Sequence, residues 1–380
     1  MLTTTKKTNI KLSIILTLML IIINLNSKNS YAQNNLYNSI KIEKIYAKCI
    51  NTNHIGSLTN CKFVDNTVYV PYKNKITLIK NNKIIWKKIF KNTITSGIIA
   101  NKQLAILITK NKNLIAIDNY TGSIKWKIKL EDKLTFLIKA TNDTIYISTH
   151  DDKIIALDSS NGKKIWHSSI NTIQPSILGT HTLIKSKNTL YNISYNGKIT
   201  AINQKFGNIL WVKDMLGSQY STEYKQSLNA IKTIIFYNKI LYTLNYNGNL
   251  TAIKINTKEI LWKKTFKSKV NILKTNDNIL IVKKTGKIKL LNKDNGELIW
   301  KNNNLTTKKL TNPIFLNKLN ATIISDENGT LYLIKNDNKI TEIKEKISIS
   351  SKIKKLQKTN KENIYVLSKN GKIIYIKIKV

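Results

Sequence analysis

The stretch LYTLNYNGNLTAIKINTKEILW, residues 241–262, decides the fold. Residues 241–244 and 250–253 are short runs of aliphatic, aromatic and β-branched residues, which is typical of β-strands. Between them, the pair Asn247-Gly248 is of the kind that supplies the positive φ angles of a tight hairpin. A second polar turn leads into a third run that ends at Trp262. The stretch therefore predicts three consecutive antiparallel strands.

The same phrase recurs along the chain and usually ends in a tryptophan. Other copies read LIAIDNYTGSIKW, IIALDSSNGKKIW, ITAINQKFGNILW and IKLLNKDNGELIW. The tryptophans follow one another at intervals of 40, 40, 45, 51 and 38 residues, and they are Trp86, Trp126, Trp166, Trp211, Trp262 and Trp300. A seventh copy at residues 321–343 lacks the tryptophan, and an eighth occupies residues 364–380. A period near 40 with four short strands per copy is that of a β-propeller blade.

These repeats predict an all-β, eight-bladed β-propeller, with seven blades as the alternative. A single blade cannot bury both of its faces, so neighbouring blades must pack against each other around an axis. We expect each repeat tryptophan to be a wedge between blades, and the alanines to lie at a crowded inner position: Ala116, Ala156, Ala201 and Ala252. The last copy is one strand short, and the alternating residues 40–46 can supply it. Joining the two chain ends in one blade removes exposed sheet edges.

The first 32 residues have the features of a secretory signal peptide. Lys6, Lys7 and Lys11 precede an apolar run at residues 14–23, and Ser30-Tyr31-Ala32 resembles a cleavage site. We therefore expect a signal peptide at 1–32 and the propeller at 33–380, with an uncleaved membrane anchor as the alternative. No cysteine lies directly after the apolar run, so lipid attachment there is not indicated. In an exported protein Cys49 and Cys61 are either a disulfide or two free thiols.

The formal charge of +42 suggests an anionic partner at first. However, all 63 basic residues are lysine, and asparagine and isoleucine are also over-represented, which is the signature of an A/T-rich genome. A protein that reads DNA is expected to use arginine, whose guanidinium matches guanine edges and phosphates. We therefore expect no nucleic-acid partner, and keep binding to anionic lipid or polysaccharide as an alternative. The four histidines are scattered singly, which does not suggest a metal site.

The repeat phrase resembles that of the pyrroloquinoline-quinone-type propellers, and within them the chain is most similar to the BamB family of outer-membrane protein assembly factors. The most specific local match runs from Ser221-Thr222-Glu223 to residues 246–252. The resemblance implies a non-enzymatic, cofactor-free protein at the periplasmic side of the outer membrane. Its implied partners are the POTRA domains of BamA, other components of the assembly complex and unfolded outer-membrane proteins.

The resemblance also implies where the partner would bind. In register with Trp211, one family loop falls on residues 175–179 and the other on residues 229–231. Ile177 and Gly179 fit the family pattern, Leu178 replaces an arginine, and Asn229 stands in for an aspartate. The alternative is that these residues form ordinary loops between blades.

A quinone-dependent dehydrogenase is the alternative from the enzyme class. That chemistry needs a calcium-binding cluster, a catalytic aspartate and usually two adjacent cysteines, whereas eleven residues separate the two cysteines here. We expect Asp118, Asp158 and Asp294 to stabilise the backbone of the repeat turns, because each lies in one. The sequence therefore predicts no catalytic residue and no cofactor-binding or metal-binding residue.

Overall fold

The computed structural model describes residues 42–45, 62–64, 67–80, 83–131, 135–141, 143–149, 153–169, 182–194, 198–214, 231–266, 269–305, 308–311, 313–335, 343–349, 352–359, 362–369 and 373–378. Within these ranges every regular element is a β-strand. The chain divides into a large unit, residues 46–375, and a small one that combines residues 1–45 with 376–380. The strands form eight sheets of four strands each.

Blades 1 to 4 follow one another along the chain. Blade 1 consists of β2 (Lys62–Val64), β3 (Thr67–Tyr72), β4 (Lys75–Lys80) and β5 (Lys83–Ile89). Blade 2 consists of β6 (Ile99–Ala100), β7 (Leu104–Ile108), β8 (Asn113–Asp118) and β9 (Ile124–Lys129). Blade 3 consists of β10 (Thr135–Ala140), β11 (Thr144–Thr149), β12 (Lys153–Asp158) and β13 (Lys164–Ser169). Blade 4 consists of β14 (Thr182–Ser186), β15 (Thr189–Ile193), β16 (Lys198–Asn203) and β17 (Ile209–Asp214).

Blades 5 to 8 repeat this order, and the last one takes in a strand from the beginning of the chain. Blade 5 consists of β18 (Ile231–Tyr237), β19 (Ile240–Asn245), β20 (Asn249–Lys254) and β21 (Glu259–Thr265). Blade 6 consists of β22 (Val270–Lys274), β23 (Asn278–Lys283), β24 (Ile288–Asn292) and β25 (Leu298–Asn302). Blade 7 consists of β26 (Ile314–Leu316), β27 (Ala321–Ser325), β28 (Thr330–Lys335) and β29 (Ile343–Ser348). The sheet of blade 8 has the order β1 (Ile42–Ile45), β32 (Ile373–Ile378), β31 (Ile364–Ser368) and β30 (Ile353–Lys358).

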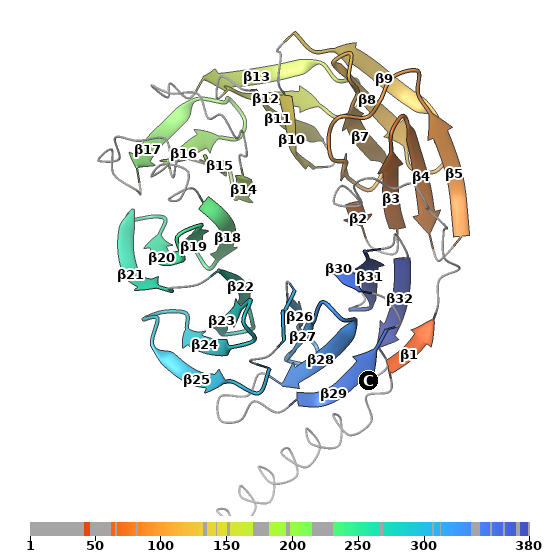
Figure 1. Cartoon of the computed structure of the whole chain (residues 1–380). Helices are drawn as coiled ribbons and strands as arrows, with labels where there is room; N and C mark the ends of the chain where they lie inside the picture. Colours follow the sequence, from red (N-terminus) through yellow and green to blue (C-terminus); the bar gives the residue numbers. More distant parts are fainter. Residues whose placement is uncertain are drawn as a thin grey trace, which may run out of the picture. The chain divides into compact units, whose positions relative to one another are not determined.

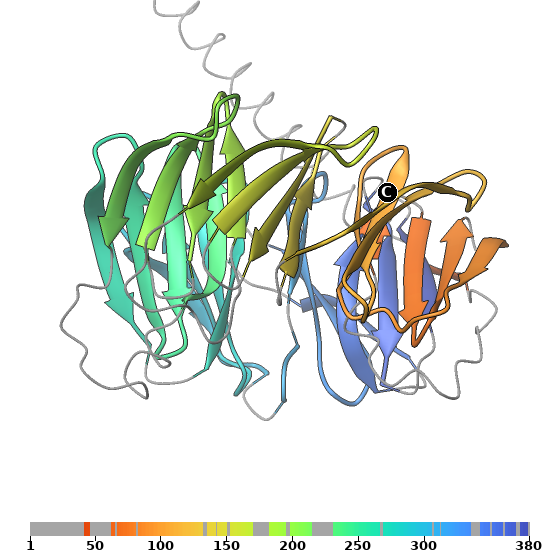
Figure 2. The same ribbon diagram turned by 90° about the horizontal axis from the view of Figure 1, so that it is seen from above.

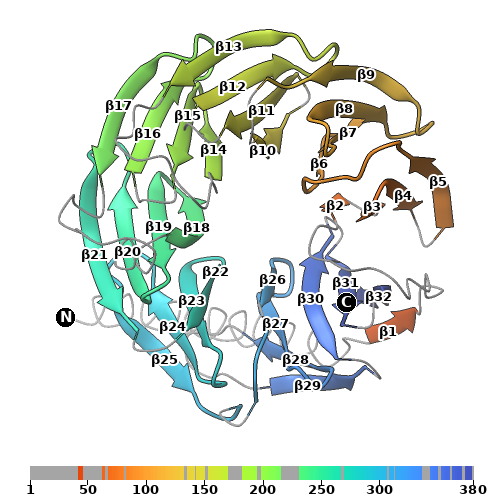
Figure 3. The same ribbon diagram turned by 45° about the horizontal axis from the view of Figure 1, so that its top comes forward.

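The large unit is a β-propeller, and the prediction of eight blades is confirmed (Figures 1 and 3). The first strands of neighbouring blades lie next to each other around the centre, for example β2 and β6, or β22 and β26. Blades 1 and 8 share a buried cluster that includes Val68, Ile79, Tyr365 and Leu367, so the ring closes. The strand expected within residues 40–46 is β1, the fourth strand of blade 8. In the turned view, the strands of one blade twist relative to one another (Figure 2).

One row of side chains repeats from blade to blade. In blade 3 the strand register places Tyr146, Ala156 and Trp166 opposite one another on β11, β12 and β13. Ala156 is fully buried, and the two rings approach to 6.0 Å between their centroids. Blades 4 and 5 repeat the row with ring distances of 5.9 Å. Because the alanine side chain is small, the two rings on either side of it have space to contact each other. The expectation of a crowded inner position is confirmed.

The hairpin at Asn247-Gly248 differs from its prediction in one detail. Gly248 has a φ of 85°, whereas Asn247 does not adopt a positive φ. The N–H of Gly248 donates to the carbonyl oxygen of Asn245 at 3.1 Å, so a β-turn precedes a single left-handed residue. This is the geometry of a three-residue hairpin loop rather than that of a two-residue Asn-Gly turn.

Burial changes systematically from the second strand of a blade to the fourth. Every residue of β7 is buried, whereas on β13 only Trp166 and Ser168 are. The middle strands are therefore nearly continuous apolar runs, because both faces of the sheet contact another blade. Between blades 5 and 6, for example, Trp262 and Phe266 pack with Ile279 and Ile281 in one cluster. The hydrophobic core is thus a series of layers between blades.

The layer between blades 3 and 4 contains polar groups without partners. Asn192 and Thr200 lie opposite each other on β15 and β16 and are 0% and 1% exposed. Among the described residues, neither the Asn192 amide nor the Thr200 hydroxyl has a hydrogen-bond partner, and the same holds for the hydroxyl of Ser148. Burying a polar group without a partner costs roughly 1–3 kcal/mol. This layer is therefore less favourable than it would be with apolar residues of the same shape.

Thr200→Val is expected to raise the free energy of unfolding by about 1 kcal/mol, because valine keeps the shape and removes the unpartnered hydroxyl. Thr275→Val is the matched control. Thr275 is also buried, but its hydroxyl donates to the carbonyl oxygen of Asn278 and accepts from its N–H, both at 3.1 Å. That control should lose about 1 kcal/mol. Urea denaturation of both variants measures the difference, and equal destabilisation would contradict the account of this layer.

Candidate interaction surface

The loops that the resemblance assigned to partner binding lie outside the described residues. Ile177, Leu178 and Gly179 fall between β13 and β14, and Asn229 falls between β17 and β18. Each of the two segments thus connects the fourth strand of one blade to the first strand of the next. Their place in the repeat is the same, one blade apart. Their role in binding remains a prediction, as do the signal peptide at 1–32 and the state of Cys49 and Cys61, which also lie outside the described residues.

Four of the six repeat tryptophans fix their blade to a turn of the following blade. The indole N–H donates to a main-chain carbonyl oxygen 31 to 38 residues further on, at 2.8 to 3.0 Å. The pairs are Trp86 with Asn119, Trp126 with Ser159, Trp166 with Gln204 and Trp262 with Lys293. Each of these four bonds crosses from one blade to the next, which agrees with the predicted role of the tryptophans as wedges between blades.

A glycine in the next turn lets each of these four rings approach the backbone. A Cβ on Gly207 would lie 2.6 Å from the Trp166 ring, and one on Gly122 would lie 2.8 Å from Trp86. In the turn that follows Trp211 the repeat has Lys258 instead of glycine. Its φ is 61°, and its ammonium nitrogen lies 5.0 Å from the centroid of the Trp211 ring. A cation–π contact thus occupies the place where the other blades bring backbone against the ring.

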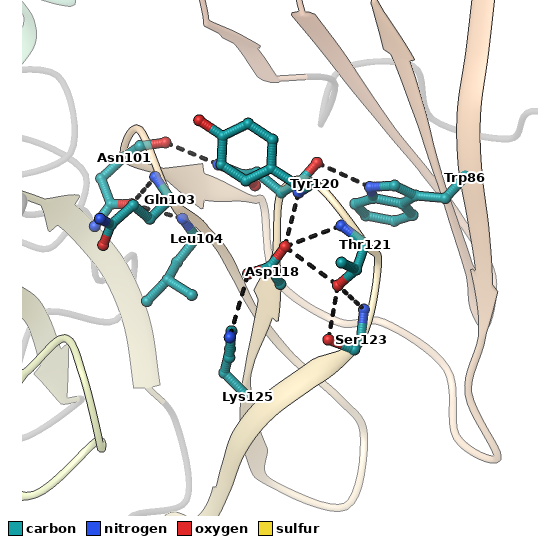
Figure 4. Close-up of polar contacts among 10 residues, drawn as sticks. Trp86, Asn101, Gln103, Leu104, Asp118, Tyr120, Thr121, Ser123 and Lys125 are labelled. Atoms are coloured by element: carbon teal, nitrogen blue, oxygen red, sulfur yellow. Dashed lines mark hydrogen bonds and ion pairs between the residues drawn. The ribbon is translucent and has the colours of Figure 1, made fainter.

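In the turns beside these four tryptophans, a side chain at the first position of the turn holds the backbone, and Figure 4 shows the turn beside Trp86. One carboxylate oxygen of Asp118 accepts the N–H groups of Tyr120 and Thr121, both at 2.9 Å. These hydrogen bonds, the one from Thr121 foremost, lower the pKa of Asp118, and Lys125 contributes from 3.5 Å. Asp158 does the same in blade 3, and the hydroxyl of Ser160 is the main cause of its lowered pKa. The prediction that aspartate stabilises these turns is confirmed for both residues.

In blade 6 the same role belongs to a different residue from the one predicted. Asn292 occupies the first position of the turn, and its side-chain oxygen accepts the N–H groups of Asp294 and Asn295. The carboxylate of Asp294 instead contacts the Lys293 ammonium at 2.6 Å. The difference arises because the N–H groups to be bonded lie two and three residues after the first position of the turn. Only a side chain at that first position can accept from them.

The fourth strands expose apolar side chains, a feature that the sequence analysis did not predict. On β13 the register pairs Ala156 with Trp166 and then Leu157 with Lys164, so Ile165 is the extra residue of a β-bulge. The bulge lets Trp166 point inward while Ile165 stays 51% exposed. The same shift recurs on the fourth strands of blades 1, 2, 4, 5 and 6. The exposed apolar residues before the tryptophans include Ile84, Ile85, Ile209, Leu210, Ile260 and Leu261.

Lysine occurs on six of the eight first strands, with β6 and β26 as the exceptions. The first strands of all eight blades, β2, β6, β10, β14, β18, β22, β26 and β30, contain no Asp or Glu. Burial, and second the charge of Lys355, lowers the pKa of Lys62. Burial and Lys185 do the same for Lys139. The inside of the ring is thus a region of positive charge without acidic neighbours on its own strands.

These shifts predict how stability responds to alkaline pH. The folded state holds the pKa of Lys62, Lys139 and Lys232 below the ordinary 10.5, so it binds fewer protons than the unfolded chain just below that pH. Stability therefore rises with pH in that window. Burial raises the pKa of Tyr242 and Tyr365 from 10.0 to about 12. The stability that these two protonated tyrosines contribute is therefore lost as the pH rises from 10.0 to about 12. We expect a maximum of stability near about pH 10, measurable by denaturation between pH 7 and 12. A steady fall from pH 7 would contradict it.

Within the ranges that the structure describes, no group of three or more His, Cys, Asp or Glu side chains is arranged to hold a metal ion. The same ranges contain no helix that is long and apolar enough to cross a membrane. What the described surface offers is therefore apolar residues on the outer strands and positive charge.

Comparison with known proteins decides the family. Residues 72–302 match the family described as outer membrane protein assembly factor BamB. The chain belongs to the BamB family. A BamB from Moranella endobia is 24% identical over 79% of this chain and 81% of its own length. A BamB from Yersinia pestis is 22% identical over 64% of this chain, a match that spans 62% of the Yersinia protein.

Solved structures agree on the fold. The crystal structure of BamB from Moraxella catarrhalis superposes with a TM-score of 0.70 at 18% identity, over 89% of this chain and all of the other. A europium-containing methanol dehydrogenase gives a TM-score of 0.61 at 10% identity, over 92% of this chain and 94% of the other. At such identities each likeness shows the propeller fold alone. Membership of the BamB family thus rests on the sequence match.

Proposed function

We propose that this chain is a non-catalytic periplasmic scaffold of the machinery that assembles outer-membrane β-barrel proteins. In this role it binds the POTRA domains of a BamA-like component and assists the insertion of barrel proteins. The observation that carries the proposal is the match to the BamB family over residues 72–302, within a ring of eight blades. Relatives across this family are named outer membrane protein assembly factors.

The described surface supports a role in protein contact. Each fourth strand from β5 to β25 has one edge without a partner in its sheet, and apolar side chains such as Ile85 and Leu210 are about half exposed beside that edge. Extended chains recognise such edges through main-chain hydrogen bonds and side-chain contacts. The bulges and nearby lysines at the same time limit permanent edge-to-edge association. A surface of this kind suits brief contact with unfolded barrel proteins.

The binding site for the POTRA domains is assigned to the two connections after β13 and β17. Ile177, Leu178 and Gly179 belong to the first, and Asn229 to the second. In this chain the arginine and aspartate of the family pattern are absent at these positions. We therefore expect contact to depend more on apolar burial by Ile177 and Leu178, and less on ion pairs, which salt would screen.

The test is a titration of the full mature chain into the POTRA region of BamA from the same organism, at low and at physiological salt. Ile177→Asp is the test variant, because it places a charge in the assigned contact, and Ile165→Asp is its control on the neighbouring strand. Saturable binding that survives salt and is lost only in Ile177→Asp supports the proposal. Absence of binding, or equal loss in both variants, contradicts it. Oxidation of alcohols with a dye acceptor after addition of quinone and calcium would favour the dehydrogenase alternative.

A further inference from the structure

An open cavity of about 330 Å³ lies between blades 5 and 6. It is formed by the end of β21, by β23 and β24, and by the turn into β25. Phe266 and Leu291 are buried in its wall, while Leu298 is half exposed. Gly296 lies in the lining, where a Cβ would come within 2.7 Å of the Trp262 ring. Its lining residues are Lys264, Thr265, Phe266, Lys283, Lys289, Leu291, Gly296 and Leu298.

Three lysines line this cavity and no acidic residue does. They are Lys264, Lys283 and Lys289, which come from β21, β23 and β24. Within the described part of the chain, none of the three makes an ion pair. Burial, then the charges of Lys289 and Lys287, lower the pKa of Lys283. The ammonium groups thus repel one another, and no acidic side chain in the lining offsets this repulsion. An anion in the cavity would relieve this repulsion.

The position of these lysines in the repeat argues against a mere effect of composition. Lys283 lies three residues after Leu280, which occupies the register position of Tyr242 in blade 5. At the place of Lys283, blades 2 to 5 have short polar residues, which are Thr109, Thr149, Ser194 and Asn245. Several of these bond the backbone of the hairpin that follows, as Ser194 does with the carbonyl oxygen of Lys198. Blade 6 gives up this local bond and places a lysine in the cavity instead.

The second lysine departs from the repeat in the same way. Lys289 directly precedes Leu290, the residue opposite Trp300. In blades 1 to 5 the corresponding position has an uncharged residue, which is Thr77, Ile115, Ile155, Thr200 or Thr251. Of these six blades, blade 6 alone has lysine at both positions, and this is where the cavity lies.

We propose that this cavity binds a phosphate monoester group, with Lys264, Lys283 and Lys289 as its cationic ligands. Three ammonium groups match a phosphate dianion better than they match a single carboxylate. The volume exceeds that of a phosphate and is within the range of small-molecule sites, so the remainder of the ligand can extend past Leu298. The phosphate can belong to a lipid headgroup or to a small soluble molecule. This site is separate from the loops assigned to POTRA binding.

The experiment measures binding of the full mature chain to two probes, inorganic phosphate and vesicles of phosphatidylcholine that contain phosphatidic acid. The test variant combines Lys283→Gln with Lys289→Gln. The control combines Lys254→Gln with Lys263→Gln, which removes the same charge from exposed positions of blade 5 that do not line the cavity. Lys264→Gln alone is a second test variant, which leaves the two half-buried lysines, Lys283 and Lys289, unchanged. Melting temperatures of all variants check folding.

We expect the test variant to bind at least about tenfold more weakly than the native chain, and the control less than about twofold. Binding of both probes identifies a small anion as sufficient, and binding of vesicles alone identifies a lipid headgroup. Equal weakening by test and control variants, or no binding of either probe, would overturn the proposal. Neither outcome depends on whether the chain binds POTRA domains.

Discussion

Gly248→Ala should lower the free energy of unfolding by about 3 kcal/mol, one of the largest effects expected of any single added methyl group in this chain. Gly248 has a φ of 85°, a conformation that costs an alanine about 1–2 kcal/mol. A Cβ there would also lie 2.3 Å from the carbonyl oxygen of Phe266. That oxygen is part of the backbone, so the hairpin itself must move, which adds roughly 1–3 kcal/mol.

Gly97→Ala is the matched control for that prediction. A Cβ on Gly97 meets no atom within 4 Å, and its φ is not positive. We expect a change within about 0.5 kcal/mol. Chemical denaturation followed by tryptophan fluorescence measures both variants. If the two alanines had the same effect, the backbone contact between the β19–β20 hairpin and the end of β21 would not contribute as described.

Trp166→Ala should cost about 3–5 kcal/mol, because it removes the largest side chain from the layer between blades 3 and 4. Trp166 is 8% exposed, its ring contacts that of Tyr146, and its N–H donates to the carbonyl oxygen of Gln204 at 3.0 Å. Trp166→Phe keeps much of the apolar contact and loses the hydrogen bond. We expect it to cost about 1–2 kcal/mol, which separates the bond from the packing.

The neighbour Ile165 provides the control for this second prediction. It precedes Trp166 in the sequence and is similarly apolar, but the β-bulge leaves it 51% exposed. Ile165→Ala is therefore expected to change stability by less than about 0.5 kcal/mol. A small effect of Trp166→Ala would contradict the role of the tryptophan as a wedge and would favour a ring that is kept for binding a ligand.

The repeat made much of the fold predictable. The interval between tryptophans predicted the length of one blade. The C-terminal copy, which is one strand short, indicated that a strand from the beginning of the chain, β1, completes blade 8. The roles of Ala156 and Trp166 followed from the same phrase, because a recurring small residue opposite a recurring large one indicates a packed row. The role of Asn292 did not follow, since an aspartate two positions later in the turn gave the more obvious signal.

The candidate site was less predictable, for physical reasons that differ from residue to residue. Outward exposure of Ile165 depends on a bulge, which shifts the alternation by one residue and cannot be read from the pattern of apolar residues. Lys283 and Lys289 stand among 63 basic residues, and only the strand register separates them from the others. Ile177 and Asn229 were assigned by resemblance alone and lie outside the described residues.

The most direct test of the proposed function is whether the chain is part of the assembly complex in its own cells. Membranes are solubilised in mild detergent, the BamA-like component is isolated through an affinity tag, and the amount of this chain in the complex is measured. We expect it to be retained at close to one copy per BamA-like subunit, and to remain after a wash in high salt. Its absence, or its release by salt alone, would contradict a scaffold role and leave a propeller that binds some other partner.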